Sequence, residues 1–111
     1  MNNIFYAESA TALGSGATFT GTTRDCGFVA GGVCRYAAFN AFAVADQAGT
    51  MRIEISTNGT TWVKATADQA LTAGTPLFLS IPVTAKYHRA VYVNGGTAQG
   101  SFMLNTSYTV A

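Results

Sequence analysis

The residues that could carry out chemistry in this chain are few and far apart. His88 is the only histidine, so a zinc site would have to combine it with Cys26, Cys34 and a carboxylate. The compact spacings C-x-x-C and H-x-x-x-H do not occur in the sequence. The carboxylates are scattered along the chain, and none occurs after residue 68. They are Glu8, Asp25, Asp46, Glu54 and Asp68. We therefore expect no metal site and no cofactor.

Motifs that hold phosphate or present a nucleophile are also missing. Gly14-Ser15-Gly16 has Phe19 where the dinucleotide-binding pattern G-x-G-x-x-G needs its third glycine, and no G-x-x-x-x-G-K-[ST] loop occurs. No G-x-S-x-G segment is present to raise a catalytic serine on a sharp turn. We therefore expect no catalytic residue, no small-molecule substrate and no enzyme activity.

Length and composition limit the remaining classes. The chain has 111 residues, which suits one domain spanning residues 1–111. Only 10% of the residues are charged, against about 25% in an average globular domain, and the net charge is +1. This balance argues against nucleic-acid binding and against a basic membrane-surface helix. No run approaches the roughly 18 apolar residues of a membrane span, and no signal-peptide pattern begins the chain, so we expect synthesis in the cytoplasm.

The dominant pattern is that of an all-β protein. Short runs of β-branched and aromatic residues alternate with clusters of Gly, Asn, Asp and Thr. About eight antiparallel strands at this spacing favour a two-sheet β-sandwich, jelly-roll-like rather than immunoglobulin-like. The predicted strands are Ile4–Ala7, Ala17–Thr23, Tyr36–Ala45, Met51–Ser56, Thr61–Thr66, Pro76–Val83, Tyr87–Asn94 and Ser101–Val110.

Two stretches allow finer predictions. Alternation places Met51, Ile53 and Ile55 on one face of a strand, and Asn58-Gly59 predicts a tight hairpin turn after it. Trp62, the only tryptophan, is expected in the core near Ile55.

In the Tyr87–Asn94 strand, His88 shares a face with Ala90 and Tyr92. We expect His88 to be a half-exposed strand residue rather than a base or ligand. Arg89 lies on the opposite face, so it is expected either at the exposed end of the strand or in a hydrogen bond.

Parts of the chain resemble a known family. The stretches are Phe39–Glu54 with its Asp46-Gln47-Ala48-Gly49-Thr50 turn, Asn58–Trp62, and Thr84–Gln99. They are similar to small capsid decoration, or cement, proteins of tailed bacteriophages. The resemblance implies a structural protein on the outer surface of the virion's head shell. It also implies that the protein binds the major capsid protein, often as a homotrimer, and has no catalytic residues.

Two segments are candidate contact sites for such a partner. Met1–Gly16, with Ile4, Phe5 and Tyr6, is predicted to form either an extended N-terminal arm or the first strand of the chain's own sandwich. Phe28 and Val29 stand in a glycine-rich loop between Cys26 and Cys34, and exposed apolar loop tips often contact partners. In a reducing cytoplasm the two cysteines are expected to be buried thiols rather than a disulfide.

Two other functions remain open from the sequence. A carbohydrate-binding module needs two or three aromatic rings exposed together on one face. The candidates for these rings are Tyr36, Tyr87, Tyr92 and Tyr108. An adhesive domain of a tail fibre or baseplate is usually part of a longer chain, whereas this sequence is short and begins at Met1. We therefore expect a free-standing head protein.

Overall fold

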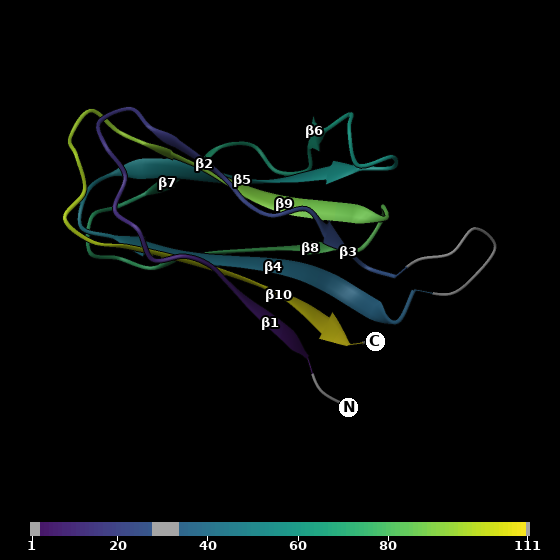
Figure 1. The fold of residues 1–111 in the computed structure, drawn as a ribbon. Coiled ribbons are helices and arrows are strands. Elements are labelled where there is room, and N and C mark those ends of the chain that lie inside the picture. The colour runs from purple at the N-terminus through teal and green to yellow at the C-terminus, as the bar shows by residue number, and fades with distance from the viewer. Residues whose placement is uncertain (1–2, 28–33, 111) are drawn as a thin grey trace.

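The computed structural model of this chain describes residues 3–27 and 34–110, and these residues form two antiparallel β-sheets packed face to face (Figure 1). No helix occurs among them. The first and last strands lie side by side, so the described chain starts and ends at the same end of one sheet. The strands are β1 (Ile4–Ser9), β2 (Thr18–Thr20), β3 (Arg24–Asp25), β4 (Tyr36–Ala45), β5 (Gly49–Ser56), β6 (Val63–Lys64), β7 (Gln69–Leu71), β8 (Leu77–Pro82), β9 (Tyr87–Asn94) and β10 (Phe102–Val110).

The strand order is that of a jelly roll. One sheet has four strands in the order β1-β10-β4-β8, and the other has six in the order β2-β9-β5-β6, with β3 also on β9 and β7 also on β5. Counting β2 with β3 and β6 with β7 leaves eight strands in two sheets of four, which is the jelly-roll number. The predicted all-β sandwich is therefore confirmed.

The long strands agree best with the predictions. The observed β4 and β9 have the predicted ends, and the predicted Ala17–Thr23 strand shrinks to the three residues of β2. The predictions missed β3 and β7, which contain two and three residues. Such short pieces carry too few residues to show an alternating pattern.

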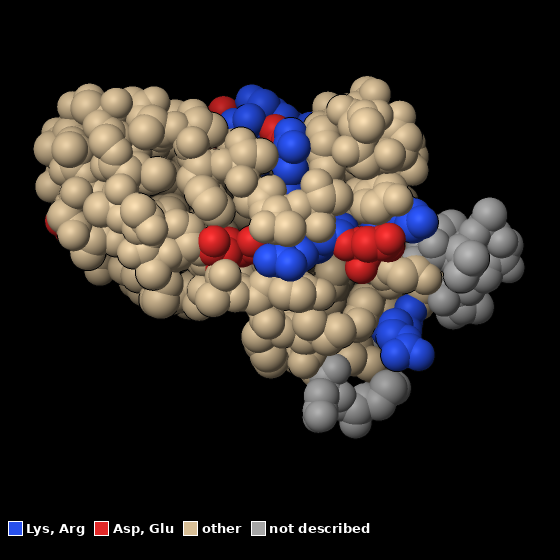
Figure 2. All heavy atoms as spheres, in the orientation of Figure 1, with Lys and Arg blue, Asp and Glu red and all other residues tan. Residues whose placement is uncertain are grey.

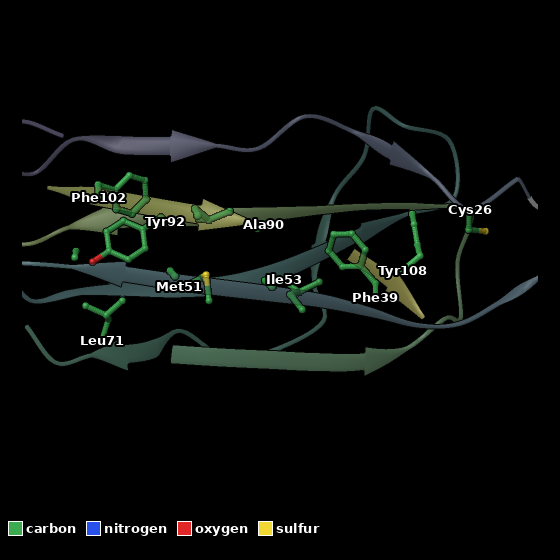
Figure 3. Close-up of a cluster of buried hydrophobic side chains, with 13 residues drawn as sticks. Cys26, Phe39, Met51, Ile53, Leu71, Ala90, Tyr92, Phe102 and Tyr108 are labelled. Atoms are coloured by element: carbon green, nitrogen blue, oxygen red, sulfur yellow. The ribbon is translucent and has the colours of Figure 1, made fainter. Parts of the chain in front are cut away.

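The core between the sheets combines large side chains with several alanines (Figure 3). The inner face of β4 carries Phe39 and then three alanines, Ala41, Ala43 and Ala45, all buried. The alanines leave room for large side chains from other strands, and a well-packed core needs that match in volume. Those residues are Met51, Ile53, Leu71, Tyr92, Phe102, Leu104 and Tyr108.

His88 belongs to this core, and the prediction of a half-exposed histidine was wrong. Its exposed fraction is 0%, its ring stacks on Phe39 with centroids 5.0 Å apart, and its Nδ1 lies 2.9 Å from the hydroxyl of Tyr108. Burial lowers the pKa of His88 to about 4 and raises the pKa of Tyr108. Both groups are therefore neutral near pH 7.

The hairpin after β5 exists, but its turn is wider than predicted. Val63 pairs with Ile55 and Lys64 with Glu54, so residues 57–62 form the connection. Gly59 has the expected positive φ of 79°. The side chain of Asn58 accepts hydrogen bonds from the amides of Thr60 and Thr61, at 2.9 and 2.8 Å. This side-chain hydrogen bonding shapes a local turn in place of a two-residue hairpin.

Trp62 lies outside the core, contrary to the prediction. It is half-buried on the outer side of the six-stranded sheet, with the guanidinium carbon of Arg89 4.1 Å from its ring centroid. The wider turn explains the error, because the alternation of β5 does not continue through residues 57–62. Arg89 donates a hydrogen bond to Glu54, which confirms one of the two alternatives predicted for it.

Candidate interaction surface

The outer face of the four-stranded sheet is free of charge. Its strands alternate, so the outward residues are known from the pairing and the burial pattern. None of them is Asp, Glu, Lys or Arg. The set is Phe5, Ala7, Ala38, Asn40, Phe42, Val44, Phe78, Ser80, Pro82, Met103, Asn105, Ser107 and Thr109. We call this set the neutral face.

Exposed apolar side chains concentrate on the neutral face. Phe5 and Phe78 are 74% and 69% exposed, the highest values among the large apolar side chains that the structure describes, and Met103 is 38% exposed. Phe78 packs on Phe42 with ring centroids 4.9 Å apart. Phe5, Phe42 and Phe78 line one shallow depression in this face. Exposed apolar area of this kind marks sites of contact with other molecules.

A row of uncharged polar side chains crosses the same face beside the aromatic rings. The amide nitrogen of Asn40 donates to the hydroxyls of Ser107 and Thr109, at 3.1 and 2.9 Å. The hydroxyl of Ser80 donates to the amide oxygen of Asn40 at 2.6 Å. These bonds join β8, β4 and β10 and hold the row in place, and its remaining lone pairs can accept hydrogen bonds from a partner.

The six-stranded sheet has the opposite character on its outer face. Glu54 accepts hydrogen bonds from Arg52 at 2.7 Å and from Arg89 at 2.8 Å, and Asp68 pairs with Arg52 and Lys64. Burial by itself would raise the pKa of Glu54, but the hydrogen bonds and charges of the two arginines outweigh it and lower that pKa. On the side of the molecule in Figure 2, charged side chains gather around the middle and the right, and the left end is almost entirely uncharged. The charges of this sheet largely neutralise each other within the chain.

A buried ion pair joins the two sheets at one edge. The side chain of Glu8 on β1 is 1% exposed and accepts two hydrogen bonds, each 2.9 Å long, from Arg24 on β3. Thr106 on β10 donates to the same carboxylate at 2.6 Å. The guanidinium of Arg24 also lies 3.8 Å from the ring centroid of Tyr6. This cluster fixes β1 against the other sheet and so positions Phe5 on the neutral face.

The predicted contact residues have different positions. Ile4, Phe5 and Tyr6 lie on β1, which pairs with β10 in the chain's own sheet rather than extending as an arm. Phe5 points outward, whereas Tyr6 points inward beneath Arg24. Phe28 and Val29 lie outside the described residues. Cys26 and Cys34 are thiols, and Cys34 is half-buried. Their sulfur atoms lie 3.6 and 3.5 Å from the carbonyl oxygens of Ala85 and Cys26.

The sequence predictions missed most of the neutral face. Phe42, Phe78, Met103 and Asn105 were placed on strands but on no surface. Alternation along the strands could have indicated these residues, because each of them follows or precedes a core residue and therefore lies on the opposite face of its strand. It does not say which of two apolar faces is covered, and β4 and β8 carry apolar residues on both.

The described residues hold no group of three or more His, Cys, Asp or Glu side chains that could bind a metal ion. In the same part of the chain, no helix has the length and hydropathy needed to cross a membrane.

The four tyrosines considered for carbohydrate binding do not form one exposed platform. Tyr92 and Tyr108 are fully buried, and Tyr36 stacks on Tyr108 at 4.7 Å.

Comparison with known proteins places the chain in a family. The model of the family described as "Uncharacterised protein YqxG N-terminal domain" matches residues 1–109. The chain belongs to the YqxG N-terminal domain family. No curated protein sequence matches it.

Solved structures agree with the observed fold. The PBSX exported protein XepA is similar with a TM-score of 0.84 and 25% identity, over 97% of this chain and 37% of XepA. This YqxG-type chain therefore spans little more than a third of the length of XepA. PirA has a TM-score of 0.51 and 12% identity, over 96% of this chain and 91% of PirA. The pilus structure described as "Bacillus endospore appendages form a novel family of disulfide-linked pili" has a TM-score of 0.52 and 10% identity, over 99% of this chain and 87% of the other. The last two show a shared fold alone.

Proposed function

We propose that this chain is a non-catalytic structural protein that decorates the outer surface of a phage head. In this role its neutral face binds the major capsid protein and stabilises the shell. The observation that carries the proposal is that the two most exposed aromatic side chains, Phe5 and Phe78, both lie on a sheet face without charge, while the other sheet keeps its charges paired. The resemblance of Phe39–Glu54 and Thr84–Gln99 to capsid decoration proteins supports the choice of partner.

The neutral face suits a permanent contact better than a steered encounter. Protein interfaces have cores that are depleted in charged residues and enriched in aromatic ones and methionine. The neutral face shares these features, because it has no charged residue and contains three phenylalanines and Met103. A contact without charge gains little from long-range attraction, so added salt should barely weaken it. A shell protein that stays bound once assembled needs a slow release rate more than a fast association.

XepA is described as an exported PBSX protein, and that description concerns XepA. If the similarity extends to location, this chain also acts outside the cell, which agrees with a place on the surface of a released phage particle. The neutral face carries no Asp, Glu, His, Cys, Lys or Arg side chain, which supports a role in binding rather than in catalysis.

Co-sedimentation with purified, undecorated phage heads tests this proposal. We expect saturable binding at a fixed ratio to capsid subunits, changed less than about twofold between low and high salt. Met103→Lys and Asn105→Lys place a charge on β10, one of the two inner strands of the neutral face, and each should weaken binding at least tenfold. Val63→Lys is the matched control, because Val63 is 56% exposed on the other sheet and its variant should bind like the wild type.

Two results would contradict the proposal. The absence of saturable binding to heads would remove the capsid as partner, and a glycan array would then test the adhesive alternative directly. Binding that Val63→Lys weakens as much as Met103→Lys would show that the neutral face is not the contact surface.

A further inference from the structure

The four-stranded sheet has two long free edges. Its outermost strands, β1 and β8, contain six residues each and pair on one side only, with β10 and β4. The six-stranded sheet differs, because its outer positions are taken by short pieces of two or three residues: β2, β3, β6 and β7. Short, interrupted edge strands are one way in which proteins prevent unwanted pairing with other chains. The edges of the four-stranded sheet lack that protection.

Charge does not protect these two edges either. Strand β8 contains no charged residue, and the only one in β1 is Glu8, whose carboxylate is buried against Arg24. An outward-pointing charged side chain, especially a lysine, also protects an edge strand from pairing with other chains, and neither β1 nor β8 carries one. Only the register shift near Ser9 and the proline at the end of β8 interrupt them, which leaves Ile4–Ala7 and Leu77–Ile81 as regular edges.

The strand directions make the two edges complementary. All three pairings in the sheet are antiparallel, so β1 and β10 run in opposite directions, as do β10 and β4, and β4 and β8. It follows that β8 runs opposite to β1. When two copies are placed edge to edge in the same orientation, β1 of one copy meets β8 of the next as an antiparallel pair. The junction thus continues the pattern of the sheet.

The side chains at the two edges match as well. Cross-strand partners form rows across the sheet, one joining Phe5, Ser107, Asn40 and Ser80, and the next joining Ala7, Asn105, Phe42 and Phe78. When these rows continue across the junction, Phe5 of one copy lies beside Ser80 of the next copy and diagonal to the Phe78 of that next copy. Diagonal neighbours in a sheet are within reach of aromatic side chains. The two most exposed large apolar side chains of the described chain therefore cover each other in part.

We propose that β1 of one copy of this chain pairs with β8 of another copy to form a continuous sheet. The interface is heterologous, so copies close into a ring when the rotation between neighbours permits and otherwise form an open chain. Either assembly joins the neutral faces of successive copies side by side. The inference goes beyond the proposed function, because it concerns the chain by itself and needs no capsid.

The test measures molar mass in solution for the chain and two edge variants. Phe5→Lys blocks the edge of β1 and Phe78→Lys blocks the edge of β8, and both side chains are exposed enough for each variant to fold. Size-exclusion chromatography with light scattering should give a mass of at least two copies for the wild type and of one copy for each variant. Val63→Lys should associate like the wild type, and circular dichroism should show all variants folded.

Mixing the two edge variants gives the decisive result. Phe5→Lys keeps an intact β8 edge and Phe78→Lys keeps an intact β1 edge, so an equimolar mixture should form one junction and stop at two copies. Four results would overturn the inference: a wild type that is monomeric at its highest soluble concentration; association unchanged in both variants; a mixture that stays monomeric; or dimers of Phe78→Lys with monomers of Phe5→Lys, which would indicate pairing of β1 with β1. None of these results depends on whether the protein binds phage heads.

Discussion

His88 is buried between the sheets, where it stacks on Phe39 and contacts Tyr108, and its Nε2 has no hydrogen-bond partner among the described residues. Burial lowers its pKa from 6.5 to about 4, so the unfolded chain binds a proton more readily than the folded one. The stability that comes from the neutral His88 should thus be fully present above about pH 6.5 and be lost progressively as the pH falls toward 4. Because His88 is the only histidine, no other imidazole contributes.

We expect the free energy of unfolding to fall by about 2 kcal/mol between pH 7.5 and 5. Urea unfolding at several pH values measures this change. His88→Gln is the control, since it removes the titrating group and should flatten the dependence above pH 5, although it will lower stability at every pH. A wild-type profile that is flat from pH 7.5 to 5 would contradict the burial of a neutral imidazole.

Trp62 allows a second prediction at this scale. Its ring is half-buried against Arg89 on the outer side of a sheet, so Trp62→Ala should cost about 1–2 kcal/mol, well below the 3–5 kcal/mol of a core aromatic. Phe102→Ala, at a side chain 5% exposed, should show the larger loss. Urea unfolding followed by circular dichroism compares the two variants. Equal losses would place Trp62 in the core after all.

At the scale of the elements, the Glu8–Arg24 pair holds β1 against β3. Arg24→Met leaves a buried carboxylate without its cation, and we expect a loss of about 3 kcal/mol. The double variant Glu8→Leu with Arg24→Met removes both charges and should recover most of that loss. Urea unfolding at pH 7 measures both. A loss below about 0.5 kcal/mol for Arg24→Met would show that the pair behaves like an exposed surface ion pair.

The strands also differ in how well the sequence predicts them. β4 and β9 have ten and eight residues with a largely alternating pattern of burial, and their ends were predicted correctly. In β3 and β7 the pairing with β9 and β5 creates the strand, because the local sequence has no pattern of its own. The turn at residues 57–62 depends on hydrogen bonds that the side chains of Ser56 and Asn58 accept from the amides of Gly59 and Thr61. These bonds compete with the tight turn that Asn58-Gly59 suggested.

For the whole molecule, the pairing of the first strand with the last sets the folding behaviour. Ile4 pairs with Tyr108, and β4 pairs with both β8 and β10, so most sheet contacts join distant parts of the chain. Folding dominated by such contacts takes about milliseconds to seconds. Stopped-flow refolding followed by the fluorescence of Trp62 should therefore give a main phase in this range. Refolding within microseconds would contradict the role of long-range pairing.

The sequence alone was enough to establish an all-β chain with few titratable groups, a low charge and long alternating strands. These properties follow from composition and from the two-residue period of a strand, which is local. The jelly-roll order of the sheets is also consistent with that pattern, although several sandwich topologies share it.

Tertiary structure decided which side of each strand became the surface. Strands β4 and β8 carry apolar side chains on both faces, and only the packing of the second sheet buries Phe39 and leaves Phe42 and Phe78 outside. The same packing buried His88 and moved Trp62 out of the core. Burial depends on which distant strand covers a face, and that information lies in the pairing of segments far apart in the sequence rather than in any one of them.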